Sequence, residues 1–404
     1  MNTGSNNLLI IGIDNSSLAY SAKKAGYDTF TIDYFGDFDV RRISDGFIPV
    51  IEQKPGVSSG RFEENYSPKA LLQLFEVFRH QHKFMGTLLS SGLDDSFNVL
   101  YKINEECKII GNSPETIRTI RDKKKFFQKL EKVGVSQPET LITSSLDLAI
   151  KKAKDIGYPL ILKPSEGFAG TGIRKVHDQQ QLVKEFRNLS LHRNKEIVVQ
   201  EYIKGTPASI SFMAAYPKSK IIALNEQLLG LKKVYQPEPF GYCGNITPYL
   251  PNRHTMKRCK KIVEKITYSF QLMGSNGVDL VISEDDIPYV IEVNPRFQGS
   301  LGCIERVYGI NLVKLHLEAC KNKKIEKNQC HPSLFSTRLI IYAPKRITAP
   351  DLVSKPSLRD VPCPGSIIEE GEPICSIISD GLTRDESLKR AQETARSIFN
   401  HVLN

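Results

Sequence analysis

The sequence predicts a protein that combines α/β and α+β architecture in two or three packed units, and three observations predict it. Residues 8–112 alternate short apolar strands with amphipathic helices, which is typical of a doubly wound parallel sheet. Residues 160–293 instead carry a succession of strands rich in β-branched residues, which favours a mostly antiparallel sheet. The chain has 404 residues, whereas a single hydrophobic core stops growing near about 250 to 300 residues.

The amino-terminal unit begins with a strand, a helix and a second strand. Leu8 to Ile13 is an apolar strand, Ser17 to Ala25 is a helix that Gly26 ends, and Thr29 to Asp33 is the second strand. The turn from Gly12 to Ser17 lacks the further glycines that let a pyrophosphate approach the backbone. A dinucleotide site is therefore not expected in this unit.

Three further elements complete this unit: a helix over Pro68 to His82 and strands over Gly86 to Ser90 and Ile109 to Asn112. Asn112 or Ser113 caps the helix that follows, with Pro114 at its first position and Glu115 in its first turn. These signals predict that the first unit covers residues 1–113.

The second unit, residues 114–325, is expected to have two lobes. Residues 135–203 form a small α+β lid with strands over Leu160 to Lys163 and Ile197 to Gln200 and a helix near Gln179 to Leu189. The other lobe is an antiparallel sheet covered by a helix from Thr255 to Met273. Its strands are expected over Ser211 to Ala215, Ile221 to Gln227, Gly277 to Ser283 and Pro288 to Val293.

Residues 326–404 are expected to form a small carboxy-terminal unit. It contains a strand over Ser336 to Tyr342, a proline-rich stretch, and an amphipathic helix from Arg384 to Val402.

Composition excludes several classes of protein. No apolar run approaches the roughly 20 residues of a membrane helix, and the polar amino terminus lacks the pattern of a secretory signal. The eight cysteines contain no C-x-x-C pair, which fits reduced thiols in a cytoplasmic protein. The formal net charge is +10, but the lysines form short clusters without interleaved aromatic residues. We therefore expect neither a membrane nor a nucleic-acid partner.

The most informative residues are three oxygen donors on two adjacent strands. Glu292 and Asn294 alternate along one strand and so share a face, and Asp279 on the preceding strand joins them if it points the same way. Mg²⁺ prefers a few such ligands completed by phosphates and water. Arg296, two residues beyond Asn294, would point toward the charge that develops there. The plainer interpretation is a pair of surface carboxylates, but both interrupt apolar strands, where unpaired carboxylates are costly.

A second set of residues is suited to phosphate. Lys163 ends a buried strand and leads into a glycine-rich stretch, Gly167 to Gly172, whose backbone N–H groups could cradle oxygens. The segment from Val198 to Gly205 is a strand leading into a hinge, whose main chain could pair with an adenine edge. Each segment alone has an ordinary explanation, a hairpin loop or a connector.

Taken in order, these segments resemble the ATP-grasp superfamily over roughly Ile109 to Gly309. Residues 36–39, 242–245 and 294–300 and the Pro364-Gly365 pair resemble archaeal predicted ATP-dependent carboligases related to biotin carboxylase. The resemblance implies that the first unit is a pre-ATP-grasp domain and the second a two-lobed ATP-grasp domain.

The resemblance also implies roles for individual residues. Arg296 and Lys163 would be catalytic, and Asp279, Glu292 and Asn294 would bind Mg²⁺ or Mn²⁺. The implied ATP-binding residues are Lys123, Lys163, Gly167, Gly170, Thr171, Gly172, Gln200, Glu201, Tyr202, Ile203 and Ser209. The implied substrate contacts are Gln298, Ser300 and Glu305, which could instead cap or pack the next helix.

The function implied is that of an ADP-forming ligase. It would activate a carboxylate as an acyl phosphate and transfer it to an amine of a small molecule, and superfamily habit implies a homodimer. A biotin-carboxylase-like carboxylase that uses bicarbonate is the alternative. A catalytically silent ATP-binding protein is a further alternative, against which the intact Asp279, Glu292, Asn294 and Arg296 argue.

Overall fold

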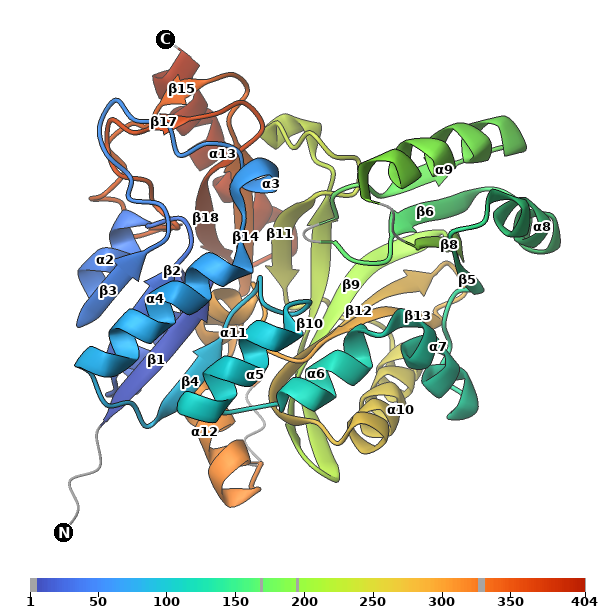
Figure 1. The fold of residues 1–404 in the computed structure, drawn as a ribbon, viewed down its shortest axis with the longest axis horizontal. Coiled ribbons are helices and arrows are strands. Elements are labelled where there is room, and N and C mark those ends of the chain that lie inside the picture. The colour runs from blue at the N-terminus through green and yellow to red at the C-terminus, as the bar shows by residue number, and fades with distance from the viewer. Residues whose placement is uncertain (1–5, 168–169, 194–195, 326–330, 404) are drawn as a thin grey trace.

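A computed structural model describes residues 6–167, 170–193, 196–325 and 331–403, which are shown in Figure 1. The amino-terminal part is a four-stranded parallel sheet in the order β3-β2-β1-β4. Its elements are β1 (Asn7–Gly12), α1 (Ser16–Lys24), β2 (Asp28–Asp33), α2 (Phe38–Ile43), β3 (Gly46–Pro49), α3 (Phe62–Asn65), α4 (Pro68–Gln81), β4 (Gly86–Leu89) and α5 (Phe97–Glu106).

Both faces of this parallel sheet are covered. Leu8 and Ile10 of β1 pack with α1, whereas Leu9 and Ile11, which point the other way, pack with α4 and α5. This double cover explains why β1 is apolar from Leu8 to Ile11, and it confirms the predicted doubly wound unit. The predicted strand at Ile109 to Asn112 is wrong, because only Ile109 forms an isolated bridge, to Thr87.

A lid follows two connecting helices, α6 (Pro114–Arg121) and α7 (Lys123–Lys132). Ser113 caps α6 by accepting the backbone N–H of Thr116 at 3.1 Å. The lid sheet has the order β5-β8-β6-β7, and its core lies under two helices. Its elements are β5 (Thr140–Thr143), α8 (Leu146–Ile156), β6 (Leu160–Pro164), β7 (Arg174–Val176), α9 (Gln179–Arg193) and β8 (Ile197–Glu201).

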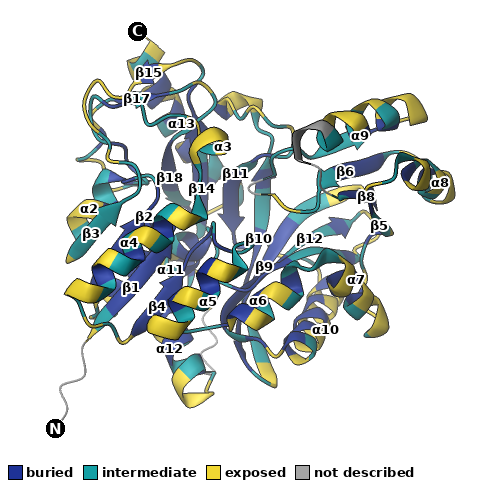
Figure 2. Ribbon diagram, in the orientation of Figure 1, coloured by how far each residue is buried: buried dark blue, intermediate teal, exposed yellow. Residues whose placement is uncertain are grey.

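The centre of the molecule is an eight-stranded sheet in the order β13-β12-β9-β10-β11-β14-β18-β16. Its amino-terminal elements are β9 (Gly205–Ala215), β10 (Lys218–Leu229), a 3-10 helix η1 (Lys232–Val234), β11 (Tyr242–Thr247), α10 (Arg253–Phe270), β12 (Met273–Ser283) and β13 (Pro288–Asn294). Helix α10 buries its apolar side on β9, β10, β12 and β13 (Figure 2). It ends earlier than predicted, because Gln271 takes a left-handed conformation and Met273 already begins β12.

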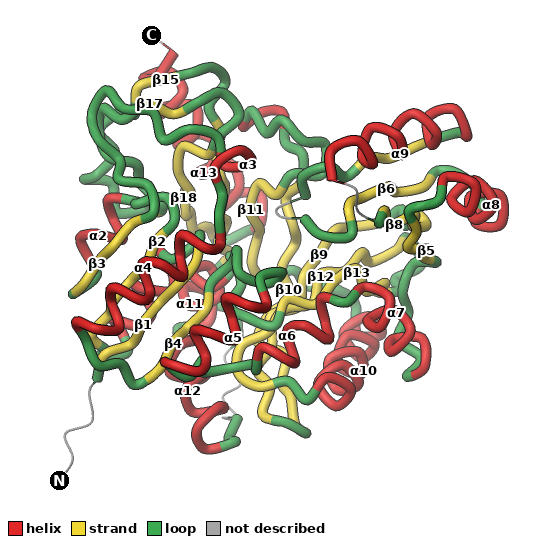
Figure 3. The backbone as a smooth tube through the Cα atoms, viewed as in Figure 1, coloured by secondary structure: helices red, strands yellow, loops and turns green. Residues whose placement is uncertain are grey.

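The carboxy-terminal segment continues the same sheet. β14 pairs with β11 and β18 pairs with β14, while the stretch between β15 and β18 is mostly loop (Figure 3). The remaining elements are α11 (Leu301–Tyr308), α12 (Leu312–Asn322), β14 (Phe335–Tyr342), β15 (Ile347–Thr348), β16 (Leu358–Arg359), β17 (Ile367–Ile368), β18 (Pro373–Gly381) and α13 (Arg384–Leu403). The unit boundaries at residues 113 and 325 stay predictions.

No helix in the described ranges is both long enough and apolar enough to cross a membrane.

Candidate functional site

The three predicted metal ligands lie on one face of the β12–β13 hairpin. Asp279 pairs with Glu292, and Gly277 with Asn294, so side chains two residues apart on β13 stand beside Asp279. The Asn294 amide donates to Asp279 Oδ2 at 2.8 Å. Gln227 on β10 donates to Asp279 Oδ1, also at 2.8 Å. The shared face expected from strand alternation is therefore present.

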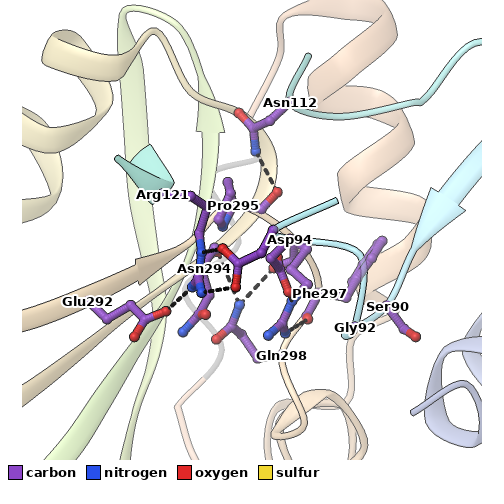
Figure 4. A network of polar contacts seen from close by, with 12 residues as sticks. Ser90, Gly92, Asp94, Asn112, Arg121, Glu292, Asn294, Pro295, Phe297 and Gln298 are labelled. Atoms are coloured by element: carbon purple, nitrogen blue, oxygen red, sulfur yellow. Dashed lines mark hydrogen bonds and ion pairs between the residues drawn. The ribbon is translucent and has the colours of Figure 1, made fainter. Parts of the chain in front are cut away.

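Three cations surround Glu292. Arg121, at the end of α6, binds Glu292 Oε1 (Figure 4). It also reaches Asp95, with Nε 2.6 Å from Oδ1. Lys123, the first residue of α7, places Nζ 3.4 Å from Glu292 Oε2. Lys163 on β6 of the lid contributes its charge from a third segment. We call Asp279, Glu292, Asn294, Arg121, Lys123 and Lys163 the hairpin centre.

The charges of the hairpin centre shift one another's pKa values. Burial, followed by the negative charge of Glu292, raises the pKa of Asp279 to about 6. Burial would also raise the pKa of Glu292, but Lys123, Arg121 and Lys163 outweigh it and hold that pKa far below its ordinary value. Burial, followed by the charge of Lys123, lowers the pKa of Lys163 to about 8. The cations thus keep Glu292 ionised, and they outnumber the two carboxylates of the hairpin centre, which favours the binding of an anion.

Two carboxylates and one amide oxygen are a donor set that suits Mg²⁺ with phosphate ligands. Within the described parts of the chain, no group of three Asp, Glu, His or Cys side chains could hold a metal ion by itself. Asp279, Glu292 and Asn294 therefore fit a divalent ion that arrives with a polyphosphate better than a permanently bound metal.

The predicted adenine hinge lies beside Lys163. The Lys163 ammonium donates to Gln200 Oε1 at 3.1 Å, and Gln200 in turn donates to Thr140 at 2.8 Å. Lys175 lies over the ring of Tyr202, 3.6 Å from its centroid. β6 and β8 are antiparallel, with Lys163 opposite Val198, so the Lys163 side chain reaches Gln200 diagonally. Glu201 lies opposite Leu160 at the start of β6, and Ile203 follows it.

The glycine-rich stretch lies against the central domain. Residues 168 and 169 are outside the described residues, but Gly170 has φ +84° and a Cβ there would lie 2.2 Å from the Phe240 carbonyl oxygen. Gly172 also has a positive φ, +75°, so the turn containing Thr171 requires glycine on both sides. Arg174 Nη1 binds Glu238 at 2.5 Å, which ties the lid to the same loop.

Arg296 is held by the amino-terminal part of the molecule. Its Nε lies 2.9 Å from Asp94 Oδ2, and Nη1 donates to the Phe297 carbonyl at 3.0 Å. Asp94 and Asp95 follow β4, at the carboxyl end of the parallel sheet. Asp94 and Asp95 thus fix two arginines, Arg296 and Arg121, at the hairpin centre.

The predicted substrate contacts differ in their surroundings. Gln298 folds back and donates to the Arg296 carbonyl at 2.7 Å, and Ser300 lies 3.1 Å from the hydroxyl of Ser211. Glu305 accepts bonds from Ser21 at 2.5 Å and from the Leu312 N–H at 2.7 Å. Glu305 therefore joins α1, α11 and α12, as expected of a packing residue.

Ser209, the predicted ribose contact, is in register with Asp279 on the neighbouring strand β9. Its hydroxyl accepts from the buried Asn225 amide at 3.2 Å, and it is itself buried. Ser209 therefore lies on the same face as the hairpin centre but next to β10.

Sequence reasoning did not identify the roles of four residues that the structure places here: Arg121, Asp94, Asp95 and Gln227. One weak signal was available, since Asp94 and Asp95 follow a buried strand that ends a βα unit, where ligands of open α/β sheets bind.

Comparison with known proteins adds family information. Residues 120–300 match the family model for the ATP-grasp domain. An uncharacterized protein of Methanocaldococcus jannaschii is 28% identical over 399 residues, 98% of this chain and 90% of that protein. The carbamoyl phosphate synthase large chain of Pyrococcus furiosus is 29% identical over 221 residues, 54% of this chain. The match spans only 20% of that synthase.

Solved structures share the fold along nearly the whole chain. The biotin carboxylase domain of 2-oxoglutarate carboxylase from Hydrogenobacter thermophilus, in complex with MgADP and bicarbonate, has a TM-score of 0.76. That match covers 99% of this chain and 91% of the domain at 16% identity. An L-amino acid ligase from Bacillus licheniformis has a TM-score of 0.71 at 16% identity, with 98% of each chain covered. At such identities the likeness shows the fold alone.

Proposed function

We propose that this chain, whose residues 120–300 form an ATP-grasp domain, is an ATP- and magnesium-dependent ligase. It would activate a carboxylate as an acyl phosphate and transfer the acyl group to an amine of a small molecule, with release of ADP and phosphate. One observation carries the proposal. Asp279, Glu292 and Asn294 share one face of a hairpin, and cations from three other segments surround Glu292.

The first step needs positioning and charge neutralisation rather than covalent help from the protein. A carboxylate oxygen of the substrate attacks the γ-phosphorus of ATP, and the bond to the β–γ bridging oxygen breaks to release ADP. Lys123 and Lys163 would bind the phosphate oxygens, because both ammonium groups face the hairpin. Mg²⁺, held by Asp279, Glu292 and Asn294, would neutralise phosphate charge when bound.

In the second step the amine nitrogen attacks the acyl carbon, phosphate leaves, and the amine loses its proton. Arg296 would stabilise the charge on the acyl phosphate, and Asp94 holds its guanidinium in place. The lid excludes water that would otherwise hydrolyse the acyl phosphate. Gly170 and the Arg174–Glu238 pair bring the glycine-rich stretch against the central domain, as such exclusion requires.

A carboxylase that uses bicarbonate is the second candidate, and the fold shared with a biotin carboxylase domain favours it. The two reactions differ only in the carboxylate and acceptor. A silent ATP-binding protein would bind Mg-ATP without turnover.

A screen of ADP release tests the proposal. Carboxylates would be crossed with amines, with bicarbonate as a separate arm, on the wild type and on Glu292→Gln and Lys163→Ala. We expect turnover with at least one carboxylate and amine pair, and its loss in both variants. Turnover that needs bicarbonate alone would favour the carboxylase. Turnover that survives both substitutions would rule out the assigned site.

The matched control is Glu284→Gln, on the turn of the same hairpin. Glu284 pairs with Lys204 at the surface, with side chains 63% and 76% exposed, so this variant should behave as the wild type.

A further inference from the structure

A second charged cluster lies where the amino-terminal sheet meets the carboxy-terminal segment. Arg338 on β14 has a side chain only 5% exposed, and it binds Asp14 at 2.7 Å and Asp360 at 2.8 Å. Asp33, Asp37 and Asp39 lie close enough that their charges act on Asp360 or on one another. We call Asp14, Asp33, Asp37, Asp39, Asp360 and Arg338 the seam cluster.

The topology of the fold gathers these residues. Asp14 follows β1, Asp33 ends β2, and Asp37 precedes α2, so three carboxylates lie at the carboxyl ends of parallel strands. Ligands of open α/β sheets bind at that edge. The loop after β16 lies against this edge of the sheet, because the Phe38 N–H donates to the Val361 carbonyl at 2.8 Å. Asp39 accepts the Val361 N–H at 2.9 Å.

The seam cluster has more negative than positive charge. Its five carboxylates face one guanidinium, and Arg338 is already occupied by Asp14, Asp360, Ser376 and the Gly299 carbonyl. Burying carboxylates without cations is costly, so such an excess needs a compensating positive charge or bound protons.

Within the seam cluster, Asp37 bears the largest free-energy cost of burying a carboxylate. It is only 7% accessible, and among the described residues no side chain or N–H group bonds to its carboxylate. By contrast, Asp33 accepts from Asn15 and from the Gly36 N–H, and Asp39 accepts from Ser16 at 2.6 Å. Burial, followed by the charges of Asp33 and Asp360, raises the pKa of Asp37 well above its ordinary value. Its carboxylate is thus a largely buried acceptor that receives no hydrogen bond from the described part of the chain.

The seam cluster adjoins the hairpin centre through one loop. Gly299 lies five residues after Asn294, and its carbonyl accepts from Arg338 Nη1 at 3.0 Å. A Cβ at Gly299 would meet Arg338, Asp14 and Tyr242, the last two at 3.4 Å. The charges of both Asp14 and Asp279 act on Tyr242, which therefore lies near both clusters. The two clusters are therefore neighbours along this loop.

A bare metal ion does not suit the seam cluster. In the described ranges no three carboxylate, thiolate or imidazole groups come close enough together to bind one metal. Carboxylates spread over a wider space suit an organic cation, whose N–H groups point in several directions. Asp14 and Asp360, with side chains 28% and 20% exposed, leave the cluster open to solvent on one side.

We propose that the seam cluster binds a positively charged amine of the acceptor substrate, with Asp37 as its main partner. This inference rests on the proposed ligase function and narrows it. The acceptor carries at least two basic nitrogens, one that is acylated near Arg296 and one that stays charged at the seam. The acceptor class is that of diamines and basic amino acids.

The test uses probes paired by length. Isothermal titration would compare L-lysine with L-norleucine and 1,5-diaminopentane with 5-aminopentan-1-ol, on the full-length protein loaded with Mg²⁺ and an ATP analogue that is not cleaved. We expect the charged member of at least one pair to bind at least about tenfold more tightly, since hydrogen bonds to charged groups have that strength. Asp37→Asn should abolish that preference, whereas Asp28→Asn, an exposed carboxylate of the same unit, should not.

The outcomes separate this inference from the proposed function. Equal binding within every pair, or a preference that survives Asp37→Asn, would overturn the acceptor assignment and leave the ligase proposal in place. Failure of the nucleotide itself to bind, measured in a separate titration, would overturn both. If Asp37→Asn does not fold, the paired probes on the wild type decide alone.

Discussion

The hairpin centre and the seam cluster are both buried and charged, but the hairpin centre has more cations than carboxylates and the seam cluster has more carboxylates than cations. At the hairpin centre three cations face two carboxylates, Glu292 is ion-paired, and Asp279 accepts hydrogen bonds from two amides. In the seam cluster one arginine faces five carboxylates, and Asp37 has no partner among the described residues. The two clusters are joined by the loop from Pro295 to Ser300.

This difference suggests that the two clusters bind ligands of opposite charge. An excess of positive charge is suited to a triphosphate, and an excess of negative charge is suited to an amine. Removing a cation should therefore have different consequences in the two places. At the seam it should cost folding stability, because the remaining carboxylates are then buried alone. At the hairpin centre it should cost catalysis.

The largest expected effect is at the seam. Arg338→Met should destabilise the protein by about 3 to 5 kcal/mol, because Asp14 and Asp360 lose their shared cation in a buried setting. Chemical denaturation monitored by circular dichroism measures this. Adding Asp14→Asn and Asp360→Asn to the Met variant should recover part of the loss. A Met variant as stable as the wild type would show that Arg338 does not balance the seam.

Arg296→Ala should have the next largest effect, on chemistry. Loss of a cation that stabilises the acyl phosphate lowers kcat by about 10² to 10³-fold. ADP release under saturating ATP measures it. Arg118→Ala on α6 is the control, since its side chain is 54% exposed and pairs with Glu115 at the surface. Equal kcat values for the two variants would contradict the role given to Arg296.

His316, which packs on Phe297 in the joining loop, should make the free energy of unfolding depend on pH by about 3 kcal/mol. Its Nδ1 accepts the Ser275 N–H at 2.8 Å and its Nε2 donates to the Ile110 carbonyl at 2.9 Å, so the neutral ring fits. Burial lowers its pKa from 6.5 to about 4. The unfolded chain therefore binds the proton first as pH falls.

His316 stabilisation should thus be complete above about pH 6.5 and be lost as the pH falls toward 4. Denaturation curves of the wild type and His316→Asn across this window isolate it, because all other groups titrate in both proteins. If the free energies of unfolding of the two proteins changed with pH in parallel, the protonation of His316 would not affect stability.

Gly277→Ala should have the smallest effect and tests the joining loop directly. The new Cβ would lie 1.9 Å from Gln298 Oε1, so the Gln298 amide must move and lose its bond to the Arg296 carbonyl. One such bond contributes about 1 kcal/mol. We expect a modest fall in melting temperature together with lower ADP release. A fall in stability without any change in turnover would show that the loop does not position Arg296.

Much of the fold could be predicted from local patterns. Alternation along β13 placed Glu292 and Asn294 on one face, and the register confirms that Asp279 joins them. The strand predicted at Ile109 to Asn112 was wrong because an apolar run does not reveal whether a pairing partner continues beside it. Likewise, no local pattern shows that β14 pairs with β11, since pairing is decided by the whole sheet.

The site was predictable where its residues are neighbours in sequence and not where they are distant. Arg121 meets Glu292 across 171 positions, and Arg338 meets Asp14 across 324. Each of these arginines looks like an ordinary charged residue of a helix or strand in the sequence. Only the tertiary fold decides which carboxylate each one binds.

The pairing of β14 with β11 also determines how far the polypeptide can be shortened. Arg338 stands opposite Asn245 in that pairing, and β11 is buried along nearly its whole length. A chain cut after residue 325 would bare the β11 edge as a template for intermolecular strand addition, and it would leave Asp14 without its counter-ion. The final segment is thus part of the folded body that carries the hairpin centre, and a fragment prepared without it should aggregate.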